Sequence, residues 1–341
     1  MSYQKYYLLS IISFSLFLFN CNKNNKILDL SSTNLEIKIN RYENKFFALD
    51  TNNLISSLKD LREKDSVFFD FYTIQMMRFG KITDTVSILS INEFLTNKNV
   101  LELRDSVELS FADMTSFEEE LTEAFKYFKH YFPKKQLPKV KTVISEFGYK
   151  AVSLDSTYLV YGLDMYLGKN FKYYGSFDFP FYLIKRFEKQ YMSIDGMEVI
   201  YNEYFGKSGL ENTDVLINEM INNGKKLYFL ESMLPKKDKN LLIGYSKEQY
   251  EWCKNSELDI WSFYNEHDLF YSKNYMEHKK HVFDGPRTSG MPKNAPGNVG
   301  SWVGWQIVNQ YMDNAKGKVS LNQLLQTDAT TIMTKSKYKP K

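Results

Sequence analysis

The sequence predicts an α+β fold, with one mostly helical domain that contains a small β-sheet. Three observations point to this class. Residues 139–163 are rich in alternating and β-branched side chains, as β-strands are, whereas the segments before and after them carry helical periodicity. An order of helices, a small sheet and further helices is typical of α+β proteins and differs from alternating βαβ units. No Pro/Gly/Ser-rich linker and no repeat interrupts the chain from residue 41 onward.

The composition is that of a globular protein with an aromatic-rich core. Apolar residues make up 43% and aromatic residues 16% of the chain, which excludes intrinsic disorder. Two Cys are too few for a disulfide scaffold. Lys and Arg number 44 against 41 Asp and Glu, so the net charge is only +3. Nucleic-acid binding driven by bulk charge is therefore excluded, and no nucleic-acid partner is expected.

The amino end has the features of a secretory signal. Residues 8–19 form an uncharged, mostly apolar run that follows Lys5. Twelve helical residues span about 18 Å, whereas the hydrocarbon core of a bilayer is roughly 30 Å thick. The run is too short for a comfortable membrane span and has the length of a signal-peptide core. We therefore expect residues 1–20 to be a signal peptide.

Cys21 directly follows this run in the string Leu18-Phe19-Asn20-Cys21. The string resembles a bacterial lipobox, in which the Cys is lipidated, although Phe19 and Asn20 depart from the usual small residues. An ordinary cleaved signal with an incidental Cys21 is the alternative. Acyl chains on Cys21 would hold the protein in a cell-envelope membrane. Because no acidic cluster follows, we expect a lipoprotein that faces the periplasm. The sequence does not distinguish anchoring in the inner membrane from anchoring in the outer membrane.

Behind the anchor, the sequence predicts three further parts. Residues 21–40 form a tether, residues 41–335 form the folded domain, and residues 336–341 form a basic tail. Helical periodicity predicts helices at 51–64, 66–79, 91–98 and 116–132. Strands are expected at 139–147, 151–154 and 157–163, and a new helix within 177–191.

The next predicted helix carries the most informative pattern of the chain. It follows the N-cap candidates in the string Asn212-Thr213-Asp214 and covers residues 215–230. Asn218 and Asn222 are four residues apart and share one helix face, with Glu219 beside them. This is the spacing of the zincin motif H-E-x-x-H, in which two His bind zinc and the Glu is the general base.

Both ligand positions of that motif hold Asn in this chain. An amide oxygen is a far poorer zinc donor than imidazole, and catalytic zinc needs three protein ligands and a water. Without an activated water, metal-assisted hydrolysis loses its nucleophile. We therefore expect a degenerate metal site with no metal, no cofactor and a vestigial Glu219. By itself, the pattern is more typical of a solvated helix face in an Asn-rich chain, and the segments around it carry the zincin interpretation.

Other potential ligands lie further along the chain. Glu251 and Glu257 follow the helix where the third ligand of a zincin, a Glu on a later helix, would come. His278 and His281 are three residues apart, and His267 is nearby, so an atypical three-His site is conceivable. These residues keep open the alternative of a membrane-anchored zinc-dependent peptidase or hydrolase that uses Glu219.

The carboxyl-terminal part contains a motif of Pro, Gly and Trp. An irregular loop leads into a helix from about Val299, in which two Gly four residues apart would leave room for a close backbone approach. Gly inside a helix costs roughly 0.8–1 kcal/mol relative to Ala, so two of them require a packing reason. The residues of this cleft or packing motif are Pro296, Gly297, Gly300, Trp302, Gly304 and Trp305.

These features together resemble the gliding motility lipoprotein GldB family of Bacteroidetes. Besides the lipobox-like start, the resemblance rests on Arg41-Tyr42-Glu43, Gly162-Leu163-Asp164-Met165-Tyr166-Leu167-Gly168, Asn218-Glu219-Met220-Ile221 and Ala295-Pro296-Gly297 with the helix after it. It implies a zincin-like, degenerate metalloprotease architecture, because related peptidases have His at positions 218 and 222. It also implies a role in surface gliding, together with the type IX secretion machinery.

The expected function is therefore that of a lipid-anchored, non-catalytic component of the gliding apparatus. Its expected partners are the membrane, through Cys21, and other proteins of the gliding and secretion machinery. The peptidase with atypical ligands is the alternative, and a structural lipoprotein without any cleft function is a third possibility.

Overall fold

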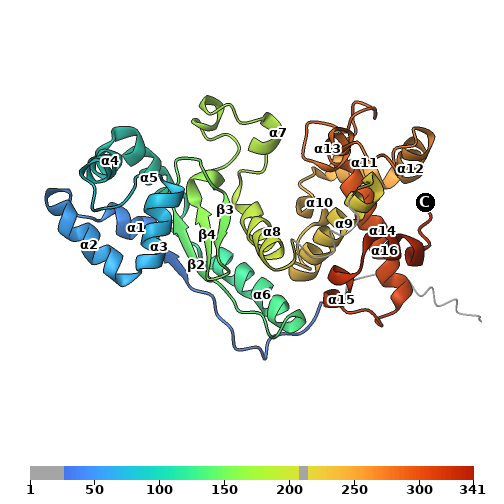
Figure 1. The fold of residues 1–341 in the computed structure, drawn as a ribbon, viewed down its shortest axis with the longest axis horizontal. Helices are drawn as coiled ribbons and strands as arrows, with labels where there is room; N and C mark the ends of the chain where they lie inside the picture. The colour runs from blue at the N-terminus through green and yellow to red at the C-terminus, as the bar shows by residue number, and fades with distance from the viewer. Residues whose placement is uncertain (1–26, 207–213) are drawn as a thin grey trace, which may run out of the picture.

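The predicted α+β class is confirmed, because helices dominate the described residues and these residues contain one four-stranded sheet. The computed structural model describes residues 27–206 and 214–341, so the signal peptide, Cys21 and Thr213 lie outside the described residues. Figure 1 shows a helical cluster near the amino end, the sheet in the middle, and a second helical cluster at the carboxyl end. Within the described ranges, no helix is long and apolar enough to cross a bilayer.

The first helical cluster packs around aromatic side chains. Its helices are α1 (Tyr42–Phe47), α2 (Leu54–Lys64), α3 (Ser66–Asp70), α4 (Thr85–Thr96) and α5 (Lys98–Ser110). Phe46, Phe68 and Tyr72 are fully buried there, and the rings of Phe46 and Tyr72 meet edge to face at 5.0 Å. The Tyr72 hydroxyl donates a hydrogen bond of 2.8 Å to the Ile144 carbonyl, which joins the cluster to the sheet.

The sheet has the order β1-β2-β4-β3. Its strands are β1 (Ile39–Arg41), β2 (Lys139–Val143), β3 (Ala151–Leu154) and β4 (Tyr158–Gly162). β1, β2 and β4 run parallel, while β3 pairs with β4 in the antiparallel direction and forms one edge. Every residue of β4 is buried, so this central strand reads as a continuous apolar run.

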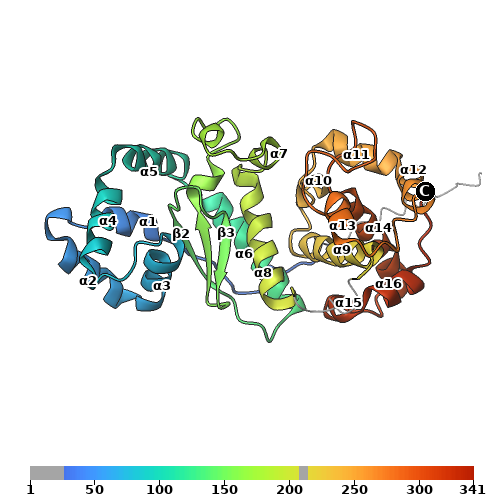
Figure 2. The ribbon, with the colours of Figure 1, turned by 45° about the horizontal axis from the view of Figure 1, so that its top comes forward.

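Two helices, α6 (Thr115–Tyr131) and α8 (Met192–Phe205), lie beside the sheet and separate it from the carboxyl-terminal cluster (Figures 1 and 2). α8 packs against β3 and β4. Gly196 makes this contact possible, because a Cβ atom there would lie 1.7 Å from the Tyr161 hydroxyl. The approach of α8 to the sheet therefore depends on a residue without a side chain.

The carboxyl-terminal cluster is built around the crossing of two long helices. Its members are α9 (Leu216–Met233), α10 (Lys239–Leu242), α11 (Lys247–Asn255), α12 (Glu257–Glu266), α13 (Tyr275–Val282), α14 (Val299–Ala315), α15 (Leu321–Gln326) and α16 (Ala329–Ser336). α9 and α14 meet backbone to backbone. A Cβ atom on Gly304 would lie 1.7 Å from the Met220 carbonyl oxygen, and one on Gly224 would lie 2.3 Å from the Gly304 carbonyl carbon.

Several segments differ from the elements expected along the sequence. The helix expected at 91–98 is interrupted at Asn97, where α4 ends and α5 begins. Residues 177–191 contain the single-turn helix α7 (Phe181–Ile184) and a short 3-10 helix (Lys189–Tyr191), and the longer helix α8 begins after them. Aromatic rings at non-helical spacing pack inward here instead; Tyr174 and Phe187, for example, meet at 4.9 Å. The folded body also starts before residue 41, since the Ile37 amide bonds to Thr122 on α6 and β1 begins at Ile39.

Candidate functional site

Glu219 lies in the first turn of α9 and faces a histidine that is distant in sequence. Its carboxylate is 2.8 Å from Nδ1 of His278, a residue of α13 that is only 2% exposed. The other ring nitrogen of His278, Nε2, is 2.7 Å from the Ser272 carbonyl oxygen. Both ring nitrogens thus face oxygen atoms, one from a side chain and one from the backbone. Glu219 is held in a partly buried pair that fixes the start of α9 to α13.

The segment just before α13 also holds the amino end of α9. The Leu216 amide donates a 3.1 Å hydrogen bond to the same Ser272 carbonyl, and the Ile217 amide donates a 2.9 Å bond to the Phe270 carbonyl. These bonds satisfy donors that a helix start leaves without partners inside the helix. The Glu219–His278 pair is thus part of a local network that closes the amino end of α9.

The two Asn of the zincin-like pattern are buried on the same helix. Asn218 is 6% exposed and Asn222 is 8% exposed. Neither the oxygen nor the nitrogen of the Asn222 amide has a hydrogen-bond partner within residues 27–206 and 214–341. A buried amide without hydrogen bonds costs about 1–3 kcal/mol, so the Asn222 side chain destabilises the folded protein by about this amount.

Glu257, the expected third ligand, is engaged elsewhere. It opens α12 and accepts a hydrogen bond from the Tyr338 hydroxyl, whose ring packs 5.2 Å from that of Trp261. This contact ties α12 to the carboxyl-terminal end of the chain. Glu251 lies on α11, where it pairs with Lys254 at 2.9 Å on the surface.

The alternative His ligands also have other partners. His281 is buried, and its two ring nitrogens lie 3.3 Å from the Tyr264 hydroxyl and 3.3 Å from Glu277; burial lowers its pKa. The Nδ1 atom of exposed His267 is 2.9 Å from the Phe263 carbonyl. His278 and His281 therefore share α13, but each is bonded to a different set of side chains.

Taken together, the side chains at the predicted degenerate metal site do not form a set of zinc ligands. Two of the proposed ligands are amides, Glu219 is paired with His278, and Glu257 is bonded to Tyr338. Within the described parts of the chain, no group of three or more His, Cys, Asp or Glu side chains is arranged to hold a metal ion.

Some residues of the carboxyl-terminal motif pack α14 against neighbouring helices, and others line a cavity. Gly300 and Gly304 face α9 and α13, and the buried indole nitrogen of Trp305 donates a 3.2 Å hydrogen bond to Glu231. Trp302 is also buried. Gly297 passes so close to Gly285 that a Cβ atom would lie 2.2 Å from the Gly285 oxygen.

The loop of this motif is fixed by two hydrogen-bonding side chains. The Tyr245 hydroxyl donates a 2.8 Å bond to the Gly297 carbonyl. The buried Thr288 hydroxyl donates a 2.8 Å bond to the Pro296 carbonyl and accepts one of 3.1 Å from the Val299 amide, which opens α14. Pro296 and Gly297 are thereby held in place as part of a cavity wall.

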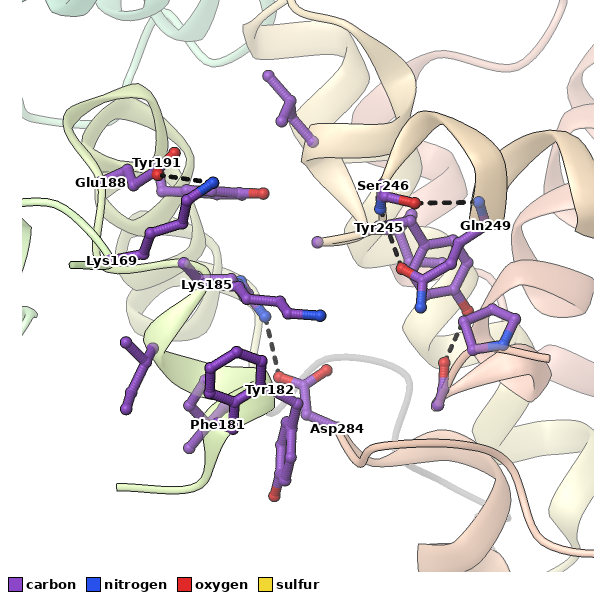
Figure 3. A pocket seen from close by; sticks show the side chains of 18 of the residues that line it. Lys169, Phe181, Tyr182, Lys185, Glu188, Tyr191, Tyr245, Ser246, Gln249 and Asp284 are labelled. Atoms are coloured by element: carbon purple, nitrogen blue, oxygen red, sulfur yellow. Dashed lines mark hydrogen bonds and ion pairs between the residues drawn. The ribbon is translucent and has the colours of Figure 1, made fainter. Parts of the chain in front are cut away.

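That cavity, which we call the α7–α11 cavity, has a volume of about 630 Å³. Figure 3 shows its two walls, one from the α7 segment and one from the end of α10 and the start of α11. The side chains that define it are Phe181, Tyr182, Lys185, Tyr245, Gln249 and Asp284, with Pro296 and Gly297 beside them. Volumes of 300–1,000 Å³ are typical of ligand-binding clefts.

A smaller polar pocket of about 210 Å³ adjoins it and includes Glu219. Arg186 and Asp284 line both spaces and form an ion pair of 2.9 Å. Glu198 on α8 pairs with Lys226 on α9 at 2.6 Å, and the Lys226 ammonium lowers the pKa of Glu198 to about 2. These two ion pairs connect the sheet side of the protein to the carboxyl-terminal cluster.

Sequence reasoning missed this charged group and the α7 wall. Arg186 and Asp284 are 98 residues apart, and neither belongs to a recognisable motif. The one available signal was the scarcity of arginine, because Arg186 is one of only six in the chain. Pro296 and Gly297 were singled out from the sequence, but nothing in it indicated that α7 would lie opposite them.

Comparison with known proteins identifies the family. A family model described as "Gliding motility protein GldB" matches residues 23–340. No match was found among curated proteins or among solved structures. The matched range covers nearly the whole chain, including the folded body, the Asn-Glu-x-x-Asn helix and the carboxyl-terminal motif. The chain therefore belongs to the GldB family of gliding motility proteins.

Proposed function

We propose that this protein is a lipid-anchored, non-catalytic component of the gliding machinery that works together with type IX secretion. Membership of the GldB family supports the gliding role. The lipobox-like string that ends at Cys21 supports an anchor in a cell-envelope membrane, with the folded body facing the periplasm. On this proposal, the zincin-like relationship stays a prediction, and the helix that carries it acts as scaffold.

The observation that carries the non-catalytic role is the Glu219–His278 pair. A general base must reach the proton that it removes, and catalytic zinc needs three protein ligands and an open position. Here the Glu219 carboxylate faces Nδ1 of His278, while Nε2 of the same ring faces the Ser272 carbonyl. The carboxylate is thus used to hold two helices together. Among residues 27–206 and 214–341, no contact favours the hydrolase alternative.

The position of the first described residues supports a short anchor. Five residues lie between Cys21 and Ile27, and the six Cα–Cα steps can span at most about 21 Å when the chain is fully extended. Next to Ile27, the Leu28 carbonyl accepts a 3.3 Å hydrogen bond from the Tyr127 hydroxyl of α6. In Figure 1 this first segment runs along the lower edge of the molecule, opposite α7. A lipidated Cys21 would therefore place the membrane opposite the α7 side.

Replacing Cys21 by Ala tests the anchor and the motility role together. We expect Cys21→Ala to move from the detergent-rich to the aqueous fraction on phase partitioning. A deletion strain that expresses it should spread at most about a tenth as far as one expressing the wild type, because acyl chains contribute about 0.8 kcal/mol per buried CH₂ to membrane binding. Asn20→Ala is the matched control, since it brings the string closer to a lipobox and should leave spreading intact. Full spreading by a Cys21→Ala protein in the aqueous fraction would contradict the proposal.

A further inference from the structure

Two hydrogen-bond donors reach into the α7–α11 cavity from opposite walls. In Figure 3, Lys185 extends from the α7 wall toward the centre, and the Gln249 side chain points toward it from α11. The Lys185 ammonium lies 5.2 Å from the centroid of the Phe181 ring. It forms no ion pair with a carboxylate of the described residues.

The Gln249 amide is oriented by a capping box. Its Oε1 atom accepts a 3.0 Å hydrogen bond from the Ser246 amide, and the Ser246 hydroxyl accepts one of 3.2 Å from the Gln249 amide. Because the oxygen is fixed on Ser246, the Nε2 group is the part of the side chain that faces the cavity (Figure 3). Gln249 therefore presents donors, and not its acceptor, to a ligand.

The other charges around the cavity are already compensated. Lys169 lies 3.9 Å from Glu188, and Arg186 lies 2.9 Å from Asp284. Lys185 is thus the uncompensated charge among these lining residues. A single positive charge with an amide donor opposite it is complementary to one carboxylate. A phosphate dianion fits less well, because the Arg186 guanidinium is occupied and Glu188 and Asp284 would repel it.

Beside Lys185, the cavity exposes an aromatic surface. Phe181 is 73% exposed, and Tyr182 lies next to it on the same wall (Figure 3). A large exposed ring at the rim of a cleft suits contact with an apolar side chain of a partner. The ligand indicated by both walls has a carboxylate and, next to it, an apolar group.

We propose that the α7–α11 cavity binds an acidic segment of a partner polypeptide. A carboxylate of the bound segment lies between Nζ of Lys185 and Nε2 of Gln249, and a neighbouring apolar side chain of the same segment packs on Phe181. Pro296 and Gly297, held by Thr288 and Tyr245, form the rigid side of the site. The inference rests on the proposed function in one respect: the peptide is bound and not cleaved.

The test uses the purified mature protein and an array of blocked hexapeptides in matched pairs that differ only by Asp or Asn next to Phe. We expect retention of the Asp member of the best pair to exceed that of the Asn member about tenfold, as a charge-assisted hydrogen bond implies. Lys185→Met should abolish the difference, and Gln249→Glu should do the same while keeping the acceptor for Ser246. Lys64→Met, at an exposed lysine of α2 outside this cavity, is the matched control and should preserve it.

The proposal would be overturned if the wild type retained both members of every pair equally, or retained neither. It would also be overturned if the Asp preference survived in Lys185→Met and Gln249→Glu. Displacement of the bound Asp peptide by millimolar inorganic phosphate, but not by acetate, would overturn it in favour of a phosphate site. Mass spectrometry of the recovered peptide separates this inference from the proposed function. Cleaved peptide would refute the non-catalytic role and leave the carboxylate site standing.

Discussion

Replacing Gly304 by Ala is expected to destabilise the protein by at least about 3 kcal/mol, at the upper end of the usual cost of overpacking. The new Cβ atom would lie 1.7 Å from the Met220 carbonyl oxygen and 2.2 Å from its carbon. These are backbone atoms of α9, so no side-chain rotation relieves the clash and the two helices must separate. The gain of about 1 kcal/mol in helix propensity is too small to compensate.

Denaturant unfolding followed by circular dichroism measures this effect. Gly175→Ala is the matched control, because a Cβ atom on Gly175 meets nothing within 4 Å. Its free energy of unfolding should change by no more than about 0.5 kcal/mol. Equal stability of the Gly304→Ala and Gly175→Ala proteins would show that α9 and α14 do not cross as closely as described.

The second large effect is expected at Asp164, a fully buried residue in the single 3-10 turn (Leu163–Tyr166) that follows β4. Its carboxylate accepts hydrogen bonds from the Ser145 amide, at 2.9 Å, and from the Phe147 amide. These bonds hold a loop in which Glu146 and Phe147 both have positive φ, at 50° and 64°. Asp164→Ala leaves two buried N–H groups unpaired, and each costs about 1–3 kcal/mol. The free energy of unfolding, measured by denaturant titration, should therefore fall by about 3–5 kcal/mol.

The pH dependence of this loss has a defined sign. Burial raises the pKa of Asp164 to about 6, although its hydrogen bonds oppose the shift. Between the ordinary value of 3.8 and about 6, the folded state binds more protons at Asp164 than the unfolded state does, so this residue's contribution to stability falls as the pH rises. The difference in free energy of unfolding between wild type and Asp164→Ala should therefore decrease from pH 4 to pH 6.5. A gap that widens would contradict the raised pKa.

Much of the secondary structure could be predicted from local patterns. The strand expected at residues 151–154 is β3, and the helix expected at 116–132 is α6 (Thr115–Tyr131). These elements have a regular apolar period and clear end signals, which fix them locally. The segment 177–191 lacks such a period, because its aromatic rings are placed by contacts with Tyr174 and not by a helix face.

The candidate site was predictable only in part. The sequence indicates that Asn218, Glu219 and Asn222 share a helix, because their spacing is local. It cannot indicate that His278, 59 residues away, meets Glu219, or that Arg186 meets Asp284. Periodicity shows which face of a helix is buried, but the partner of a buried polar side chain depends on how distant elements pack. The same limit hid Lys185 and Gln249, which lie opposite each other only in the folded chain.

The central claim is that the Asn-Glu-x-x-Asn face of α9 is structural and holds no catalytic metal. The most direct test is the zinc content of the purified mature protein, measured by elemental analysis after incubation with equimolar zinc and gel filtration. We predict far less than one zinc per chain, and no difference between wild type and Glu219→Gln. One tightly held zinc per wild-type chain that is lost in Glu219→Gln would contradict the account.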